Sequence, residues 1–593
     1  MLQNVDITAQ LCVIGGGMAG ISAAISAARC GLQTVLIQER PVLGGNASSE
    51  NRMWVCGAKG HNNRETGLVE EILLENLYRN PTRNPFLFDS ILLDFARREP
   101  NLTLLLNTTC MDAETEQGQF ACGRDRKIRS VRAYQMTTQR FFTVHAPLFA
   151  DCSGDSILAP LCGAEFMYGR EAADEYGEDT SVTEADKLVM GMSCLLQGRE
   201  TEQEVPFIPS EFATALTEED VANRPMDLYA TDENFWYLEL GGTDGTIEKT
   251  EETKEKLQRL SLGVWDHLKN SGRYRAERWD LDFLGFLPAK RESRRMRGEH
   301  VVTQREISDG TVFDDTVAFG GWPLDDHDPG GYYHRGTPNT DIRTPAPYCL
   351  PYRALYSANV ENLFFAGRNI SMTHMAMSSI RVMATCSLLG QAVGTAAFLA
   401  ATYGVSPHEV YLSHLTELRE RLMEQDCFLP DTVRAVSPLC RATPVMGGSD
   451  ELKNGQDRPN AVYGTEHCGM SVSNGSALEY RFETPQRVSA VHVVFDSDLD
   501  RQTLPGTDVE RRLVTRANLL QNRPLAHLPK TLCRGFRLTA LTEVGERVLL
   551  EEQTNRKRAY HVSVAEPVLA IRLTVYSNWG ETDKTNVFSF DFC

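Results

Sequence analysis

The amino-terminal segment carries three glycines and an acidic residue whose spacing suits a phosphorylated ligand. Gly15, Gly17 and Gly20 form a GxGxxG pattern, and Glu39 follows about 20 residues later. In this pattern the first glycine permits a tight turn, the second lets the backbone approach a pyrophosphate, and the third lets a helix pack closely on a strand. The acid is placed to accept a hydrogen bond from a ribose hydroxyl. The spacing therefore predicts a dinucleotide site.

The elements around these residues are those that such a site requires. Residues 9–14 are apolar and predict a buried strand, residues 21–30 are rich in Ala and Ser and predict a helix, and residues 33–37 predict a second strand. Met18 and Ala19 fall at the turn before the helix, whose amino-terminal N–H groups would face the phosphates. This arrangement favours dinucleotide binding over a purely structural glycine-rich turn.

The residues after the acid narrow the choice of dinucleotide. Glu39-Arg40 is followed three residues later by Gly44-Gly45-Asn46, and this segment resembles the glutathione-reductase-like FAD superfamily. The resemblance implies that Arg40, Gly44, Gly45 and Asn46 carry the backbone along a flavin. It also implies that the cofactor is FAD.

Further segments extend the resemblance to about residue 400. Residues 149–155 are similar to a turn of that superfamily, and residues 362–368 suggest a strand that ends at a glycine. A helical pattern that closes at residues 390–397 follows, and such a helix would stabilise negative charge on a reduced flavin through its amino terminus. The further cofactor contacts that the resemblance implies are Ser153, Gly154, Asp155, Gly367, Arg368, Gly390, Gln391 and Ala392.

Four more segments resemble a bacterial family of FAD-dependent oxidoreductases, many of whose members belong to sugar-degrading gene sets. These segments are residues 288–295, 350–355, 367–374 and 381–386. The resemblance implies hydride transfer between flavin N5 and a small polar substrate such as a sugar or glycoside. Cys56 stands alone after the Gly-Gly turn, which argues against dithiol chemistry. The sequence has no second GxGxxG after a strand, so no NAD(P)H domain is expected and the electron donor or acceptor stays open.

Oxidation of an alcohol or amine by a flavin needs a base and groups that hold the substrate. His374, in the segment that returns to the flavin, is the first candidate for the base, and His61, after the Gly-Gly turn, is the second. The alternatives are a structural histidine and a solvated loop residue. Tyr333 and His334 follow the flexible residues 329–331 and are candidates for an active-site loop, against a plain surface loop.

Three arginines, Arg291, Arg294 and Arg295, flank Glu292. On a helix Arg291 and Arg295 would share a face, and Glu292 would pair with Arg295 three residues later. The functional interpretation is a clamp for an anion or a polyol, with Arg291 and Arg294 as its first candidates. The alternative is an ion-pair network that braces two domains.

The fold class predicted is α/β, with a Rossmann-type FAD-binding domain, an inserted α+β substrate domain and a carboxy-terminal β-sandwich. Residues 1–160 and 351–430 supply the FAD-binding domain and trailing helices, 161–350 the substrate or cap domain, and 437–593 the sandwich. In the last part, short alternating runs between turn signals indicate antiparallel strands. Residues 478–496 resemble galactose-binding-like jelly rolls, which either bind sugars or serve packing and assembly.

The composition of the chain limits which partners the protein could bind and in which cellular compartment it is expected. The formal net charge of -20 argues against nucleic acid or an anionic membrane as a partner. No stretch is expected to approach the roughly 20 uncharged apolar residues of a membrane span, and the amino terminus does not resemble a standard secretion signal. The 15 scattered cysteines contain no CxxC, so no zinc site, iron–sulfur cluster or disulfide framework is expected. We expect a cytoplasmic protein without a bound metal, and a homo-oligomer is compatible with the sequence.

Three functional hypotheses remain. The first is net oxidation or reduction of a small polar substrate. The second is redox-neutral: transient oxidation of a sugar hydroxyl acidifies the neighbouring C–H, permits elimination, and the product then takes the electrons back. The third is a carbohydrate-binding or assembly protein that keeps FAD for structure.

Overall fold

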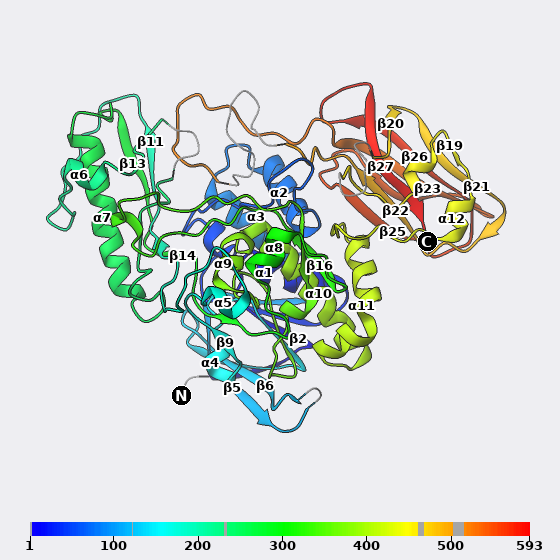
Figure 1. Ribbon diagram of the computed structural model, residues 1–593. Coiled ribbons are helices and arrows are strands. Elements are labelled where there is room, and N and C mark those ends of the chain that lie inside the picture. The colour runs from blue at the N-terminus through cyan, green and yellow to red at the C-terminus, as the bar shows by residue number, and fades with distance from the viewer. Residues whose placement is uncertain (1–2, 121–122, 230–233, 461–467, 502–514) are drawn as a thin grey trace. The chain divides into compact units, whose positions relative to one another are not determined.

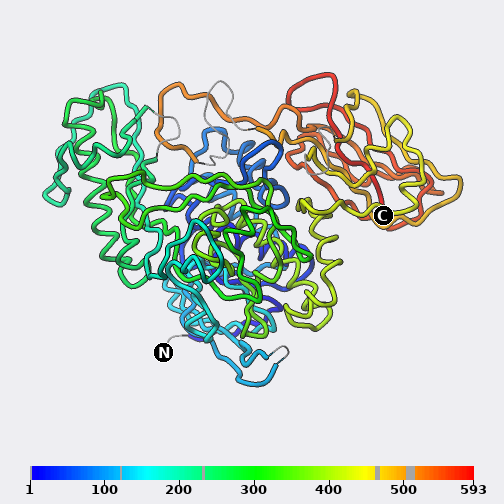
Figure 2. The backbone as a smooth tube through the Cα atoms, in the orientation of Figure 1, coloured from blue at the N-terminus to red at the C-terminus, as the bar shows by residue number. Residues whose placement is uncertain are grey.

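The computed structural model describes residues 3–120, 123–229, 234–460, 468–501 and 515–593. The chain forms two compact units, whose course is traced by ribbon and tube in Figures 1 and 2. The first unit comprises residues 1–58, 82–415 and 502–525, and the second comprises residues 59–81, 416–501 and 526–593. The chain therefore passes more than once from one unit to the other. The domain limits predicted at residues 160, 350 and 437 stay predictions.

A five-stranded parallel sheet forms the core of the first unit. Its order is β18-β8-β2-β3-β4, and every neighbouring pair is parallel. The strands are β2 (Leu11–Ile14), β3 (Thr34–Ile37), β4 (Leu102–Leu105), β8 (Leu148–Asp151) and β18 (Leu363–Phe365). Strands β2, β3, β8 and β18 are buried throughout, because a parallel sheet is covered on both faces. The strands predicted in residues 9–14, 33–37 and 362–368 are confirmed.

Two helices of this unit, α1 (Met18–Arg29) and α10 (Met383–Tyr403), pack closely against each other (Figure 1). A Cβ atom on Gly390 would lie 2.0 Å from the backbone oxygen of Ala19, and one on Gly394 would lie 2.3 Å from that of Ala23. These α10 glycines therefore allow close approach of two backbones. The predicted end of this helix at residues 390–397 is wrong, because those glycines are packing positions in the middle of α10.

We expect Gly390→Val to destabilise the first unit. A side chain at this position meets backbone rather than a movable side chain, and overpacking of this kind costs about 1–3 kcal/mol or more. Thermal unfolding of the variant should therefore begin at a lower temperature than in the wild type. Thr402→Val, at the exposed end of the same helix, is the control. Equal melting temperatures for the two variants would contradict close packing of α10 on α1.

The same helix corrects the expectation about membrane spans. By length and composition α10 could cross a membrane, and it is the one such helix in the ranges that the structure describes. However, 89% of its apolar 18-residue window is buried inside the protein. This burial is that of a core helix.

Other elements of the first unit surround the parallel sheet. A second sheet has the order β1-β7-β6-β5, and helix α3 (Pro85–Arg97) precedes β4. The strands of this second sheet are β1 (Gln3–Thr8), β5 (Thr108–Gln117), β6 (Arg126–Gln135) and β7 (Arg140–His145). The shorter helices are α4 (Leu158–Cys162), α5 (Ala173–Tyr176), α6 (Glu218–Val221), α8 (Gln304–Asp309) and α9 (His374–Ile380).

The segment between β8 and β18 forms small antiparallel sheets and one long helix, α7 (Thr250–Asn270). It has a hydrophobic cluster of its own, which includes Trp265, Trp279 and Tyr332. The strands are β9 (Phe166–Met167), β10 (Met192–Ser193), β11 (Leu196–Glu200), β12 (Glu239–Leu240), β13 (Trp279–Leu284), β14 (Ala289–Lys290), β15 (Arg295–Met296), β16 (Thr316–Gly320) and β17 (Tyr348–Pro351).

The helical arrangement considered for residues 291–295 is wrong. Lys290 pairs with Met192 on β10, and Arg295 pairs with Met167 on β9, so strand pairing overrides the local charge pattern. Arg295 still approaches Glu292, at 3.7 Å between Nε and Oε1. The expected ion pair thus forms without the expected helix.

The second unit contains two antiparallel sheets, β19-β21-β26-β23-β24 and β20-β27-β22-β25. They pack face to face, since the ring of Tyr480 on β21 lies 5.1 Å from Phe590 and 5.0 Å from Phe592 on β27. The strands are β19 (Val445–Met446), β20 (Met470–Ser473), β21 (Ala477–Gln486), β22 (Ala490–Phe495), β23 (Cys533–Thr542), β24 (Gly545–Glu552), β25 (Ala559–Ser563), β26 (Val568–Asn578) and β27 (Lys584–Phe592). The helices are α2 (Leu68–Arg79) and α12 (Pro438–Ala442), while α11 (Pro407–Glu424) continues from the first unit. The carboxy-terminal strands predicted from alternation are confirmed.

Candidate functional site

One cavity of about 250 Å³ opens where four parallel strands of the first unit end. The residues that follow β2, β3, β8 and β18 all contribute to its lining. Ligands bind at this edge of a parallel sheet because the strand ends and the helix amino termini converge there. The predicted cofactor residues in the lining are Gly15, Gly17, Met18, Ala19, Glu39, Arg40, Gly44, Gly45, Asn46, Ser153, Gly154, Asp155, Gly367 and Arg368.

The three motif glycines have different physical roles. A Cβ atom on Gly15 would lie 2.5 Å from the backbone oxygen of Cys152, and one on Gly20 would lie 1.8 Å from that of Gly15. Gly17 has φ −70° and is the residue that caps α1, and a Cβ atom there would meet nothing within 4 Å. Gly15 and Gly20 are therefore required by packing, whereas Gly17 leaves open space beside the cavity.

The amino terminus of α1 is suited to a phosphate. No side chain caps this helix, and its first turn carries no acidic residue. Uncapped N–H groups and the positive end of the helix dipole together attract an anion. Gln38 was not predicted as a site residue, but it links the glycine turn after β2 to the turn after β3. Its Oε1 accepts from Gly16 N at 2.7 Å, and its Nε2 donates to Val42 O at 3.1 Å. These residues fit the diphosphate of a dinucleotide.

Asp155 holds two cations beside the cavity. Its carboxylate lies 2.7 Å from Lys290 Nζ and 2.7 Å from an Arg368 nitrogen, and it accepts from Ser293 at 2.7 Å. Burial raises the pKa of Asp155, but Arg368 and Lys290 outweigh that effect and lower it to about 2. Asp155 is therefore ionised at neutral pH and orients Arg368.

The residues through which α10 reaches the cavity are not the predicted ones. Gly390, Gln391 and Ala392 lie in the middle of the helix and are absent from the cavity lining, and Gly390 packs against α1. The first turn of α10 lines the cavity instead, through Met383 and Cys386. The assignment of those three residues to the cofactor is therefore corrected: the amino terminus of α10 is the part that reaches the site.

His374 is fixed between two carboxylates. Its Nδ1 lies 2.9 Å from Glu292 Oε2, and its Nε2 lies 2.9 Å from Asp326 Oδ1. Burial lowers the pKa of His374, but the two carboxylates outweigh it and raise the pKa to about 10. Both ring nitrogens donate, so the imidazolium has no lone pair for a substrate proton. The predicted role of His374 as the base is therefore not supported, and the ring instead positions Asp326, whose side chain is 18% exposed.

A network of charges joins this pair to the cavity. Arg381, which lines the cavity, donates to Asp325 Oδ2 at 3.1 Å. His327 lies 3.5 Å from Asp325 and 2.6 Å from Glu239 Oε2. Asp325, Asp326 and Glu239 were missed by the sequence analysis. The run Asp325-Asp326-His327-Asp328 was the available signal, because it places a histidine among three carboxylates.

The predicted arginines act inside the protein. Arg291 donates to Ser193 Oγ at 2.8 Å and to Trp236 O at 2.9 Å, and it lies 3.3 Å from Glu239. Arg294 donates to Asp155 O at 3.0 Å. Neither arginine lines the cavity. These contacts agree with the bracing interpretation rather than with a substrate clamp.

The remaining candidates lie elsewhere. Tyr333 is 51% exposed at the end of a short helical turn, and His334 lies 3.3 Å from Asp328; neither lines the cavity. His61 belongs to the second unit, where its exposed ring lies 2.7 Å from Asp500. Within the first unit, the structure therefore does not bring Tyr333 or His334 to the cavity.

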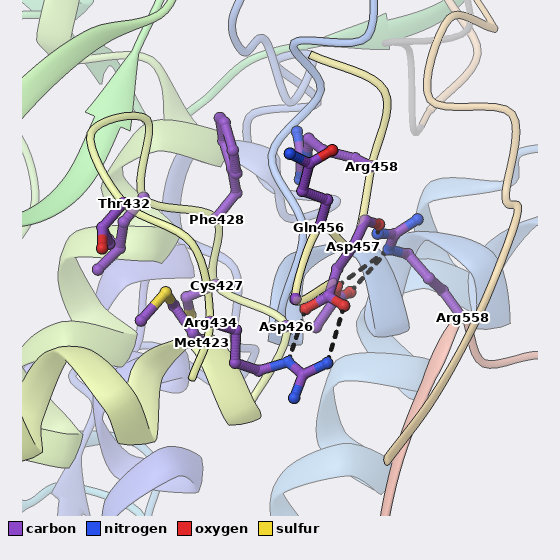
Figure 3. A pocket seen from close by; sticks show the side chains of 12 residues that line it. Met423, Asp426, Cys427, Phe428, Thr432, Arg434, Gln456, Asp457, Arg458 and Arg558 are labelled. Atoms are coloured by element: carbon purple, nitrogen blue, oxygen red, sulfur yellow. Dashed lines mark hydrogen bonds and ion pairs between the residues drawn. The ribbon is translucent and has the colours of Figure 1, made fainter. Parts of the chain in front are cut away.

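The second unit has a small pocket of its own, shown in Figure 3. Arg434 pairs with Asp457 at 3.0 Å, and Arg558 pairs with Asp426 at 3.0 Å. The pocket has a volume of about 30 Å³, which is room for about one water molecule. It is too small for an organic substrate.

Comparison with known proteins gives a family and several distant likenesses. Residues 10–422 match a family model described as FAD dependent oxidoreductase. No curated protein matches the chain. Among solved structures, a geranylgeranyl bacteriochlorophyll reductase-like protein from Thermoplasma acidophilum has 11% identity over 71% of this chain and 85% of that chain, with a TM-score of 0.30.

Two other solved structures show similarly weak likeness. A variant of quinol fumarate reductase FrdA from E. coli has 12% identity over 71% of this chain and 75% of that chain, with a TM-score of 0.28. The family 32 carbohydrate-binding module of Streptococcus pneumoniae EndoD has 10% identity over 25% of this chain and 86% of that chain, with a TM-score of 0.16. At these TM-scores the likenesses carry no argument about chemistry.

Proposed function

Because the chain belongs to the FAD-dependent oxidoreductase family, it is a flavoenzyme with FAD as its cofactor, and we propose that it acts on a small polar substrate, such as a sugar or glycoside. Bound FAD supplies a hydride acceptor or donor at its N5 atom. The single observation that carries the proposal is the cavity at the strand ends, with open space at Gly17 and an uncapped α1 beside it.

The residues that would hold FAD follow from this geometry. The turn from Gly15 to Gly17 and the amino terminus of α1 would bind the diphosphate, and Glu39 would bind the ribose. Arg368, oriented by Asp155, would add positive charge beside the cofactor. The first turn of α10 would present N–H groups to the ring end of the cavity.

The substrate would bind where Arg381 meets the carboxylate network. Asp326 does not itself line the cavity, but it adjoins Asp325, which binds the cavity residue Arg381. It is our candidate for the group that takes the substrate proton, because its Oδ1 is held by His374 and part of the carboxylate is exposed. Arg381 would donate to a substrate oxygen while Asp325 holds its guanidinium. Carboxylates and a guanidinium side by side suit a neutral ligand with several hydroxyl groups.

Finer features of the fold are also proposed. The parallel order of the central sheet supports a Rossmann-type FAD-binding domain with an inserted substrate domain, and the two stacked antiparallel sheets support a galactose-binding-like β-sandwich. A cytoplasmic location is proposed from the scattered cysteines of the sequence, which suit a reducing compartment. A bacterial origin is proposed from the resemblance of residues 288–295 and 367–374 to a bacterial family. The redox-neutral elimination remains the alternative, supported by the lack of a second GxGxxG in the sequence.

A substrate panel tests the proposal. Under anaerobic conditions, sugars, glycosides, hydroxy acids and NAD(P)H are added in turn while the visible spectrum is followed. We expect one polar substrate class to bleach the flavin band. Asp326→Asn should slow that bleaching by about 100-fold, as expected for loss of a proton acceptor, while its FAD content stays unchanged. The exposed Asp309→Asn is the control.

The outcomes of this test separate the functional alternatives. If product formation needs no added electron acceptor, the redox-neutral reaction is favoured over net oxidation. Bleaching by no compound would contradict both reactions and favour a structural role for FAD. Equal bleaching rates in Asp326→Asn and the wild type would contradict the role given to Asp326.

A further inference from the structure

Three arginines of the first unit gather outside the cofactor cavity. Arg83 lies just before α3, and Arg516 and Arg523 belong to the segment that the chain inserts between β22 and β23. Backbone N of Arg516 donates to backbone O of Arg83 at 2.9 Å, which fixes the two segments together. None of the three residues lines the cavity.

The guanidinium of Arg83 is buried without a counter-charge. The residue is 2% exposed, and its NH1 and NH2 atoms have no hydrogen-bond partner in the described part of the chain. Burial, together with the positive charges of Arg523 and Arg516, lowers the pKa of Arg83 to about 9. The group is still charged at pH 7. A buried charge with no partner is costly, and proteins normally compensate it.

Arg52 shows how the same fold compensates another buried arginine. Its NH1 atom lies 2.9 Å from Asp282 Oδ2 and donates to Gln197 Oε1 at 3.1 Å. The chain thus supplies a carboxylate to Arg52, whereas the described residues supply none to NH1 and NH2 of Arg83. The compensating group for Arg83 therefore lies outside the described residues.

The local backbone adds to the positive potential. Arg83 directly precedes Asn84, which caps α3, so it lies at the positive end of a 13-residue helix. Its φ of 55° is in the left-handed region, which few residues other than glycine adopt. Such a conformation persists where the surrounding structure requires it.

We propose that Arg83, with Arg516 and Arg523, binds an oxyanion, the phosphate or carboxylate group of a small molecule. Two oxygens of the anion would accept from NH1 and NH2 of Arg83, as in bidentate arginine–anion pairs. Arg516 and Arg523 would add positive charge beside the anion. This site goes beyond the proposed redox function, because it lies outside the cavity assigned to FAD.

The test uses the full-length holoenzyme with its FAD site saturated. Inorganic phosphate or succinate is titrated at constant ionic strength against chloride, and binding is followed by calorimetry and thermal unfolding. We expect one of the two anions to bind at one site per chain and to raise the melting temperature. Stronger binding of phosphate would identify a phosphoryl ligand, and stronger binding of succinate would identify a carboxylate ligand.

Variants separate this site from general anion effects. Arg83→Met should weaken anion binding by at least about tenfold, and without the anion it should be as stable as the wild type or more stable, because an unpaired buried charge is removed. Arg516→Met, at a half-buried position, should also weaken binding. Arg98→Met, at the exposed end of α3, is the matched control and should bind as the wild type does.

Two results would overturn the proposal. One is binding of neither anion, or equal binding by Arg83→Met and the wild type. The other is strong destabilisation of Arg83→Met without any anion, which would make Arg83 a structural residue with its own partner. FAD content is measured in each variant, so that a failure of this site is distinguishable from a failure of the proposed redox function.

Discussion

Gly17→Val should lose FAD while keeping its fold. The backbone at Gly17 has φ −70°, which valine adopts, and a Cβ atom there meets no protein atom within 4 Å. The added side chain would instead occupy the space that the diphosphate needs at the start of α1. Loss of two hydrogen bonds to a charged group, at about 1.5–3 kcal/mol each, predicts about 1000-fold weaker FAD binding. Flavin fluorescence measures the affinity, and thermal unfolding of the apoprotein measures the fold.

Gly20→Val is the matched comparison. Its Cβ atom would lie 1.8 Å from the backbone oxygen of Gly15, so this variant should lose stability before any cofactor is added. The two glycines of one motif are therefore expected to fail in different ways. Retention of wild-type FAD affinity by Gly17→Val would place the diphosphate elsewhere, and unfolding of both apoproteins would contradict the open space at Gly17.

The stabilising effect of His374 should fade as the pH rises towards 10. The two carboxylates raise its pKa from 6.5 to about 10, so the native state holds a proton that the unfolded state releases earlier. The resulting stability is fully present below about pH 6.5 and is lost as the pH passes through 10. His374→Gln leaves Asp326 without the imidazolium and Glu292 with only the longer contact to Arg295, which should cost about 3–5 kcal/mol near pH 6 and much less at pH 10.

Urea unfolding of the wild type and His374→Gln between pH 6 and 10 measures this difference. His145→Gln serves as the control, because His145 is a half-exposed surface residue of the same unit, 3.6 Å from Asp6. Its effect should be small across the range. A difference between His374→Gln and the wild type that stays constant with pH would show that His374 is not an imidazolium in the native protein.

The dinucleotide-binding residues could be predicted because they lie close together in the sequence. Gly15, Gly17, Gly20 and Glu39 lie within one strand–turn–helix–strand unit, and their spacing alone fixes their mutual geometry. The later segments at Asp155 and Arg368 follow strands that enter the same parallel sheet. Parallel strands bring their carboxyl ends to one edge, so order along the chain was enough.

The substrate end was less predictable because its contacts are long-range. Asp326 meets His374 from a loop, and Glu239 meets His327 from a separate strand. Nothing in the local pattern indicates that the two carboxylates beside His374 would take both of its ring nitrogens. The prediction for Gly390 was wrong because its contact is also long-range. A helical glycine near a cofactor segment suggested a ligand contact, whereas the backbone of Ala19 fills the space beside it.

The visible spectrum and flavin content of the purified protein test the central claim most directly. We expect a yellow protein with about one FAD per chain, or a colourless one that takes up FAD to that stoichiometry, with loss of binding in Gly17→Val. A protein that neither contains FAD nor can be reconstituted with it would contradict the assignment of the cavity at the strand ends.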